Sequence, residues 1–329
     1  MSRRGACAAP GAACMKIRVL GSAAGGGFPQ WNCNCRNCAG VRGGTLKARA
    51  RTQSSIAVGA GSGADGSPGH DQASWALVNA SPDILAQLRA NPDFQPARAP
   101  RDTAICAIVL VDGQVDHTTG LYMLRESRRP WALWCTDSVY RDLTRGNPII
   151  EVLSHYCRIE RQRMGLEGAG FFVEGVPDVH WQAVPVAGKP APYSPNREAP
   201  APGDNVALVI TDGRSRNSLF YAPGLGDVDE PTWQAMRSAA CVLVDGTFWS
   251  DDEMLRLGLS RKRAHDIGHL AQSGAGGMLE WLARLPGTTR KVLIHINNTN
   301  PILDEDSPER AELGRRGIEV AWDGMEIHL

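Results

Sequence analysis

AICAIVLVDGQVDH, residues 104 to 117, joins a continuous apolar run to a polar cluster with two aspartates, a glutamine and a histidine. An apolar run of this length is typical of a strand that is buried on both faces. The following stretch, HTTGLYMLRES (117–127), predicts a helix, so the polar cluster comes where a buried strand passes into a helix. Considered alone, this pattern favours a solvated turn in which Asp116 caps the helix that His117 begins. The rest of the chain decides whether the turn also carries chemistry.

Length and charge limit the classes of partner. The chain has 329 residues, and its 35 Lys and Arg equal its 35 Asp and Glu, so no overall field attracts nucleic acid or an anionic membrane. Its longest apolar runs are strand-sized and far below the ~18 residues that a membrane span needs. Residues 1–14 lack the apolar segment of a secretory signal, and we expect a flexible N-terminal extension there. The sequence therefore predicts a cytoplasmic protein with one domain over residues 15–329, and no nucleic-acid or membrane partner.

Strand and helix signals alternate along the chain. Apolar runs predict strands in both halves, at 17–24, 54–59, 75–81, 104–112, 131–136, 171–176, 181–186, 205–212, 217–223, 241–246, 291–298 and 318–324. Helical patterns occupy 81–90, 117–127, 138–146 and most of 264–285. Residues 186–205 contain five prolines and predict a long surface excursion. Two halves, each with strands followed by helices, suit a pseudo-duplicated α/β sandwich.

Three cysteines lie within six residues in the stretch CNCRNC. Cys33, Cys35 and Cys38 are close enough in sequence to bind one tetrahedral ion, and their soft sulfur ligands favour zinc. The alternative is three free, reduced cysteines at the surface. Because exposed thiols at this density are prone to oxidation, we expect a structural Zn(II) there instead. The fourth ligand stays open among Asn298, His295 and another cysteine.

Two further stretches place histidines beside strands or glycines. HINNTNP (295–301) follows the apolar run KVLI, and GHL (268–270) lies within a segment that we expect to be helical. A single histidine is more often a satisfied polar group than a metal ligand. Three such stretches, counting DGQVDH, together predict a shared site.

Long stretches of the chain resemble the metallo-β-lactamase superfamily and, within it, the family that acts in the biosynthesis of the redox cofactor pyrroloquinoline quinone (PQQ). The matching stretches are MKIRVLGSAAGGGFPQWNCNCRNC, NASPDI, VDHTTGLYMLRE, LFYAPGLGDVDE, DGTFWSDDE, GHL and HINNTNPILDEDSPER. They span almost everything from Met15 onward. The resemblance implies a metallo-β-lactamase-like four-layer αβ/βα sandwich with a metal site at one edge.

The usual superfamily loop HxHxDH is only half retained. Asp112 and Gln114 stand where its first two histidines would be, and the proline-rich stretch VAGKPAPYS has no histidine where the next one would fall. Pro223 and Gly224 stand near the position of the bridging aspartate. These residues are too weak a set to hold the first ion of a binuclear hydrolase.

The ligands of the second metal position are retained as Asp116, His117 and His295. Two imidazoles and one carboxylate form the facial set that leaves open coordination positions on Fe(II). The resemblance also implies that His269 acts in proton transfer or substrate orientation, with metal ligation as a lesser alternative. Asp112 is a candidate for fixing the tautomer of a histidine ligand.

The resemblance implies that the protein is an iron-dependent hydroxylase. Its substrates would be molecular oxygen and a small molecule in which a glutamate and a tyrosine are cross-linked, with the tyrosine ring hydroxylated on the way to PQQ. Loss of superfamily ligands also suits a carrier for PQQ or an intermediate, and a mononuclear metal hydrolase is a third reading. The oligomeric state stays open between a monomer and a homodimer.

Overall fold

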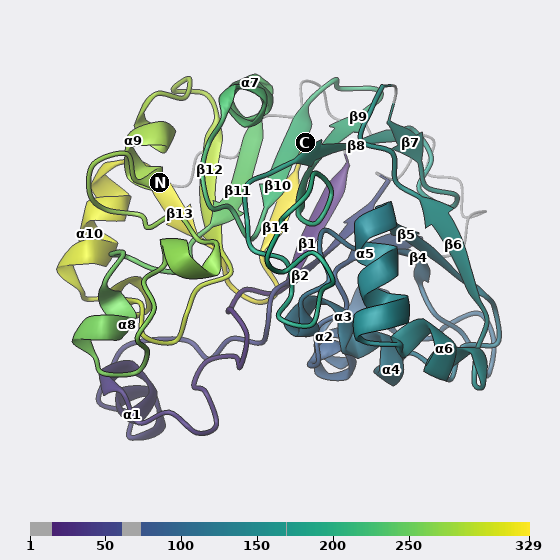
Figure 1. The fold of residues 1–329 in the computed structure, drawn as a ribbon, viewed down its shortest axis with the longest axis horizontal. Coiled ribbons are helices and arrows are strands. Elements are labelled where there is room, and N and C mark those ends of the chain that lie inside the picture. Colours follow the sequence, from purple (N-terminus) through teal and green to yellow (C-terminus); the bar gives the residue numbers. More distant parts are fainter. Residues whose placement is uncertain (1–14, 61–73, 169) are drawn as a thin grey trace.

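Two seven-stranded sheets lie face to face, and helices cover the outer side of each (Figure 1). This arrangement comes from a computed structural model, which describes residues 15–60, 74–168 and 170–329. The predicted N-terminal extension, residues 1–14, lies outside the described residues. The four layers of helix, sheet, sheet and helix confirm the predicted αβ/βα sandwich.

The first sheet contains most strands of the N-terminal half. Its order is β14 (Glu326–His328), β1 (Lys16–Gly21), β2 (Ser55–Gly59), β3 (Trp75–Val78), β4 (Ile105–Val109), β5 (Trp131–Cys135) and β6 (Ile159–Arg163). Neighbours are antiparallel from β14 to β3 and parallel from β3 to β6. The helices of this half are α2 (Ile84–Ala90), α3 (Val115–Thr118), α4 (Gly120–Met123), α5 (Asp137–Arg141) and α6 (Ile149–Ser154).

The second sheet repeats this plan. Its order is β13 (Ile318–Val320), β12 (Arg290–Ile294), β11 (Cys241–Asp245), β10 (Ser218–Ala222), β9 (Val206–Asp212), β8 (Val179–Pro185) and β7 (Phe171–Phe172). Neighbours are antiparallel from β7 to β10 and parallel from β10 to β13. The helices α7 (Glu230–Ser238), α8 (Glu253–Arg256), α9 (Met278–Ala283) and α10 (Pro308–Arg315) belong to this half. The matching order of the two sheets fits the predicted pseudo-duplication.

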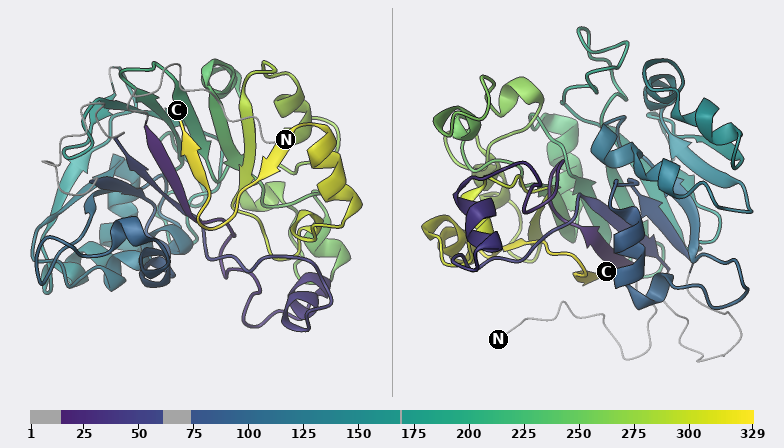
Figure 2. Two further views of the ribbon diagram at one scale, coloured as in Figure 1. Left: turned by 180° about the vertical axis from the view of Figure 1, so that it is seen from behind. Right: turned by 90° about the horizontal axis from the view of Figure 1, so that it is seen from below.

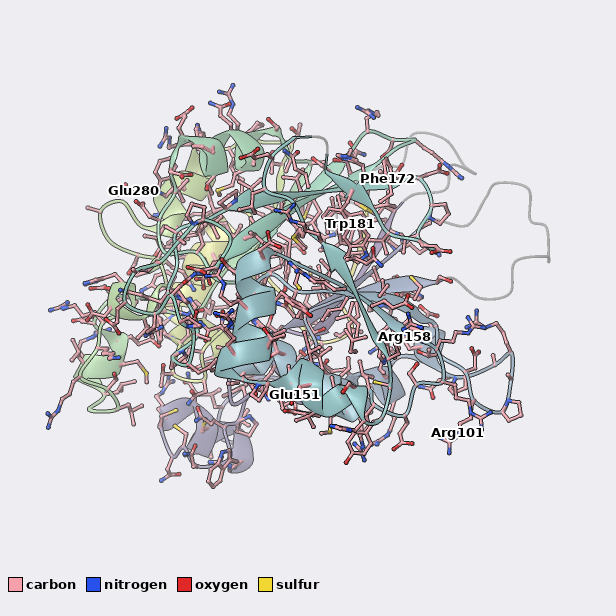
Figure 3. The ribbon with its side chains drawn as sticks, turned by 45° about the vertical axis from the view of Figure 1, so that its right-hand side comes forward. Arg101, Glu151, Arg158, Phe172, Trp181 and Glu280 are labelled. Atoms are coloured by element: carbon pink, nitrogen blue, oxygen red, sulfur yellow. The ribbon has the colours of Figure 1, made fainter. Side chains whose placement is uncertain are left out.

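Apolar side chains fill three layers, one between the sheets and one under the helices on each outer side. Trp181 on β8 is fully buried between the sheets, whereas Phe172 on the neighbouring strand is 66% exposed (Figure 3). Trp181 lies opposite Phe171 in the register of the two strands, so it points to the same face as Phe171 and to the opposite face from Phe172. This difference follows from the pleat of a strand, which points successive side chains to opposite faces. The sheets are therefore held at a fixed separation by packed side chains.

The helix α1 (Arg36–Arg42) links the two ends of the sequence. Although it comes early in the chain, it lies beside the C-terminal half, as two views show (Figures 1 and 2). Arg36 forms an ion pair with Asp304, and the buried Asn37 donates hydrogen bonds to the carbonyl oxygens of Asn298 and Asn300. The cysteine-rich segment is thereby joined to the loop that follows β12.

Two helix predictions were wrong in detail. Residues 117–127 form parts of two short helices, α3 and α4, instead of one. Between 264 and 285, helical structure is limited to the 3-10 turn His265–Ile267 and to α9. Gly268, Gly274 and Gly276 have positive φ, a conformation that interrupts a right-handed helix. In the described part of the chain, each helix is too short or too polar to cross a bilayer.

Candidate metal centre

Three strand ends from the two sheets bring their polar residues to one place. Asp112 follows β4 of the first sheet, Asp245 ends β11 of the second, and His295 follows β12 directly. All three strands belong to the parallel parts of their sheets, whose carboxyl ends are the usual position of chemistry in α/β folds. Asp112 and His295 are 5% exposed and Asp245 is fully buried. The polar turn DGQVDH therefore faces the interior of a site, and Asp116 does not cap the helix, which begins at Val115.

Asp116, His117 and His295 converge. One ligand atom from each can be chosen so that all three lie within 4.8 Å of one another. Asp116 Oδ2 lies 3.2 Å from His295 Nε2 and 3.9 Å from His117 Nε2. The glycine-rich turn packs against this carboxylate, because a Cβ at Gly25 would lie 3.3 Å from Asp116 Oδ2. Glycine in this turn, which follows β1, thus allows the close approach of its backbone to Asp116.

The two histidines of this set are held from behind by their Nδ1 atoms. His117 Nδ1 lies 2.8 and 2.9 Å from the two carboxylate oxygens of Asp112, and His295 Nδ1 lies 2.9 Å from Thr247 Oγ1. An acceptor at Nδ1 keeps the proton on that atom and leaves the Nε2 lone pair for a metal. Asp112 therefore occupies the position that its predicted role as a tautomer-fixing partner requires.

His269 lies beside the three candidate ligands, but on a loop and not on the helix that the sequence predicted. It follows Gly268, which has φ of 90°, in a loop rather than on a helix. Its Nδ1 lies 2.7 Å from Asp245 Oδ2, and its ring stacks on that of His295 at a centroid distance of 5.5 Å. Asp245 was missed in the sequence, although an apolar strand followed by Asp-Gly is the same signal as that in DGQVDH.

The charges of the site oppose the cost of burial. Burial by itself would raise the pKa of Asp116 and Asp245, but the neighbouring histidines lower both below their ordinary values. Burial would lower the pKa of His117, but Asp112 and Asp116 raise it to about 9. The carboxylates therefore favour a positive charge among the imidazoles, which either a proton or a metal cation supplies.

The donor set fits a divalent cation. His117 Nε2 is buried and has no hydrogen-bond partner among the described residues, although an unpaired buried nitrogen is costly. This atom faces the carboxylate of Asp116, which also faces His295. Two imidazole nitrogens and one carboxylate oxygen suit Fe(II) or another first-row metal, with further coordination positions left for substrate or solvent.

A cavity of about 340 Å³ opens onto this centre. The proline-rich stretch, predicted as a surface excursion, forms part of its wall and is partly buried. Tyr193 from this stretch donates a hydrogen bond to the carbonyl oxygen of Gly113, and Gln114 Nε2 donates to that of Lys189. The basic residues among those lining the cavity are His117, Lys189, Arg197, Lys262, His269 and His295.

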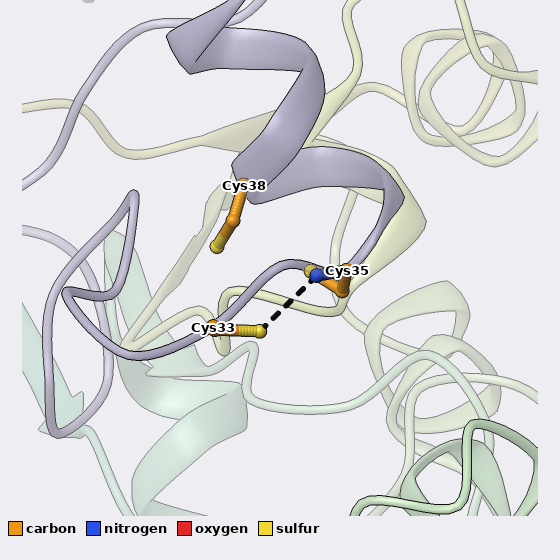
Figure 4. Close-up of side chains that lie close together, drawn as sticks. All are labelled: Cys33, Cys35 and Cys38. Atoms are coloured by element: carbon orange, nitrogen blue, oxygen red, sulfur yellow. Dashed lines mark hydrogen bonds between the residues drawn. The ribbon is translucent and has the colours of Figure 1, made fainter.

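The cysteine cluster forms a separate candidate metal site. The sulfur atoms of Cys33, Cys35 and Cys38 all lie within 4.8 Å of one another (Figure 4). The side-chain amide of Asn298 approaches the three sulfurs at 3.1, 3.6 and 3.4 Å, whereas His295 belongs to the other site. Among the described residues left open as a fourth ligand, Asn298 is therefore the one that the fold places at the cluster.

Comparison with known proteins identifies the family. The Beta-lactamase superfamily domain matches residues 74–296. Coenzyme PQQ synthesis protein B from Azoarcus sp. (strain BH72) is 62% identical over 315 residues, which are 96% of this chain and all of that protein. The protein of the same name from Cupriavidus necator is 59% identical over 313 residues, 95% of this chain and 99% of that protein.

Solved structures agree with this assignment. The crystal structure of Zn²⁺-bound PqqB from Methylobacterium extorquens superimposes with a TM-score of 0.82 at 36% identity, covering 95% of this chain and all of that one. A diphosphatase of the PhnP family shares the fold with a TM-score of 0.62 at 16% identity, over 96% of this chain and 97% of that one. The chain therefore belongs to the coenzyme PQQ synthesis protein B (PqqB) family of the β-lactamase superfamily.

Proposed function

We propose that this protein acts in PQQ biosynthesis as a non-haem Fe(II) hydroxylase of the tyrosine ring in a cross-linked Glu-Tyr intermediate. The observation that carries the proposal is that Asp116, His117 and His295 bring ligand atoms within 4.8 Å of one another, while the buried His117 Nε2 has no hydrogen-bond partner among the described residues. Three protein ligands leave positions for substrate and oxygen, which a closed four-ligand site does not. The names of the relatives support the pathway.

In this proposal, different residues bind the metal, fix the histidine tautomers and transfer a proton. Asp116, His117 and His295 hold the iron, which together with dioxygen supplies the oxidising chemistry. Asp112 and Thr247 keep the two imidazoles in the tautomer that presents Nε2. His269 has its Nδ1 held by Asp245 and lines the cavity, so its Nε2 is the atom that accepts or returns a proton.

The cavity has charges that suit the proposed substrate. A cross-linked glutamate and tyrosine, once free of a peptide, carry several carboxylates. Lys189, Arg197 and Lys262 line the cavity, and none of the three forms an ion pair within the part of the chain that the structure describes. Cations without an acidic partner in the described chain are available for ligand carboxylates, which Arg binds in bidentate geometry.

Anaerobic loading with Fe(II), followed by the cross-linked Glu-Tyr compound and then oxygen, tests the proposal. We expect oxygen uptake and a product heavier by one oxygen atom. Tight binding with intact compound and no oxygen uptake would contradict the hydroxylase and support the carrier. Hydrolysis of chromogenic esters with added zinc would favour the hydrolase instead, and we expect none.

We propose that the cysteine cluster holds a structural Zn(II). Three thiolates would bind the ion, and rotation of the Asn298 side-chain amide would offer its oxygen as a fourth ligand. Elemental analysis of the purified protein tests this assignment, with about one zinc per chain expected. Absence of zinc after purification without chelators would overturn it.

A further inference from the structure

Asn297 lines the cavity two residues after His295, and its side-chain amide has a fixed orientation. Its Nδ2 donates to Thr299 Oγ1 at 2.5 Å and to Met254 Sδ at 3.5 Å. Neither Thr299 nor Met254 is among the residues that line the cavity. Nitrogen and oxygen of an amide are alike in shape, so the neighbouring hydrogen bonds decide which of them faces a ligand.

Glu253 sets the direction of these hydrogen bonds. This buried residue begins α8, and its Oε1 accepts a hydrogen bond of 2.5 Å from Thr299 Oγ1, while its Oε2 accepts one of 2.8 Å from the backbone N–H of Trp249. Above pH 7, where Glu253 is ionised, its carboxylate oxygens can only accept, so the single hydroxyl proton of Thr299 is directed to Glu253. The lone pairs of the Thr299 hydroxyl can then accept a hydrogen bond from the side-chain N–H of Asn297. The side-chain carbonyl of Asn297 cannot face Thr299 instead, because the hydroxyl has no second proton to donate to it.

The carbonyl oxygen of Asn297 is left to face the cavity. Asn297 is 9% exposed, its Nδ2 is engaged, and its Oδ1 has no hydrogen-bond partner among the described residues. Oδ1 is also not among the fully enclosed unpaired atoms, so it keeps accessible surface. Because the residue lines the cavity, that surface belongs to the cavity wall. The wall thus offers a neutral acceptor among several cations.

We propose that Asn297 Oδ1 accepts a hydrogen bond from the phenol O–H of the tyrosine ring, and that Thr299 and Glu253 are positioning residues that aim it. This inference rests on the proposed function, because ring hydroxylation requires the phenol ring to lie at the metal. Asn297 lies two residues after His295, one of the proposed metal ligands, and both line the same cavity, so a ring bound beside the metal would lie within reach of that wall. The acceptor would orient the ring without itself entering the reaction.

The orientation of the amide can be tested without substrate. In Glu253→Gln, the introduced amide must give its oxygen to Trp249 N–H and its NH₂ to Thr299 Oγ1. Thr299 then donates to Asn297, whose amide rotates and turns its NH₂ to the cavity. At a pH above 7, where Glu253 of the wild type is ionised, side-chain amide NMR should show slow hydrogen exchange for Asn297 in the wild type and faster exchange in Glu253→Gln. Equal exchange in both proteins would overturn the relay.

The phenol contact is tested by anaerobic binding of two probes: the cross-linked Glu-Tyr compound and an analogue with phenyl in place of phenol. Wild-type protein should prefer the phenol by about three- to tenfold, the range of one hydrogen bond. Asn297→Ala and Glu253→Gln should lose this preference while binding the phenyl analogue as the wild type does. An unchanged preference in Asn297→Ala would overturn the proposal.

Controls separate this inference from the proposed function and from folding. Glu151→Gln changes an exposed glutamate on α6, outside the cavity, and should leave amide exchange and probe preference unchanged (Figure 3). Thermal unfolding checks that each variant is folded. If the wild type binds neither probe, the proposed function fails and the phenol contact fails with it. The NMR result still stands as the test of the Asn297 orientation.

Discussion

His295 and Asn298 lie three residues apart on one loop but serve two different sites. His295 Nε2 lies 3.2 Å from Asp116 Oδ2 at the candidate iron centre, and Asn298 Nδ2 lies 3.1 Å from Cys33 Sγ at the cysteine cluster. Asn37 holds the loop between them through the carbonyl oxygens of Asn298 and Asn300. The two candidate metal sites are therefore mechanically connected through a few residues of backbone.

Replacing His295 by alanine should remove iron binding and leave the zinc content unchanged. The variant loses one of three iron ligands but keeps all three cysteines and Asn298. Metal analysis after anaerobic loading measures both ions. His265→Ala is the matched control, because His265 is exposed and pairs with Asp251 away from the cavity lining. Normal iron content in His295→Ala would mean that the ligands are misassigned.

Loss of the cysteine cluster should weaken the iron centre at a distance. Cys38→Ser removes a buried sulfur ligand, so we expect loss of zinc, a lower melting temperature and weaker Fe(II) binding. The last effect follows because the loop that carries His295 loses an anchor. Cys106→Ser, which changes a half-buried thiol outside the cluster, should leave the zinc content and the iron affinity unchanged. Iron affinity that is insensitive to Cys38→Ser would contradict the coupling.

Substitution of Asp112 by asparagine should lower the affinity for Fe(II) by about 10-fold to 100-fold. The shape of the side chain and its hydrogen bond to His117 Nδ1 are kept, but the negative charge that strengthens the imidazole as a ligand is lost. Titration with Fe(II) under anaerobic conditions gives the affinity. An unchanged affinity would show that Asp112 is a structural partner of His117 with no influence on the metal.

Removing a cavity cation should weaken binding of the cross-linked Glu-Tyr compound. Arg197 lines the cavity, and its guanidinium donates to the carbonyl oxygen of Pro190, which holds it in place. Arg197→Gln should reduce the affinity and also reduce its dependence on salt concentration. Binding measured at two ionic strengths distinguishes this effect from a change of shape. Equal salt dependence in both proteins would exclude Arg197 from carboxylate binding.

Glu253 should make stability depend on pH. Burial raises the pKa of Glu253 to about 7 in the folded chain, above its ordinary value of 4.5. The folded state then binds the proton more tightly than the unfolded state, so this group's contribution to stability is present below pH 4.5 and is lost as the pH rises towards 7. Glu253→Gln should show a smaller decrease in the free energy of unfolding across this range. Chemical denaturation at several pH values measures the difference.

Several parts of this molecule were predictable because their signals are local. Apolar runs of strand length follow from the burial of both sheet faces, and the close spacing of Cys33, Cys35 and Cys38 brings their sulfurs together through a few residues of chain. The polar cluster DGQVDH, after the strand Ile105–Val109, was also recognisable in the sequence because it directly follows an apolar run. Prediction was poorest where glycines with positive φ interrupt a helical pattern, as at Gly268, because the backbone conformation there depends on packing.

The amino-acid order alone established the alternating strands and helices and the types of ligand that are available. Asp116 and His295 are 179 residues apart, and only the packing of two sheets brings their side chains within 3.2 Å. The same packing gave Asp245 its place behind His269 and directed the amide of Asn297 through Thr299 and Glu253. Periodicity describes how a segment buries one of its faces, but it has no information about which distant segment lies opposite. The direction of each hydrogen bond at the site is therefore a property of the folded chain.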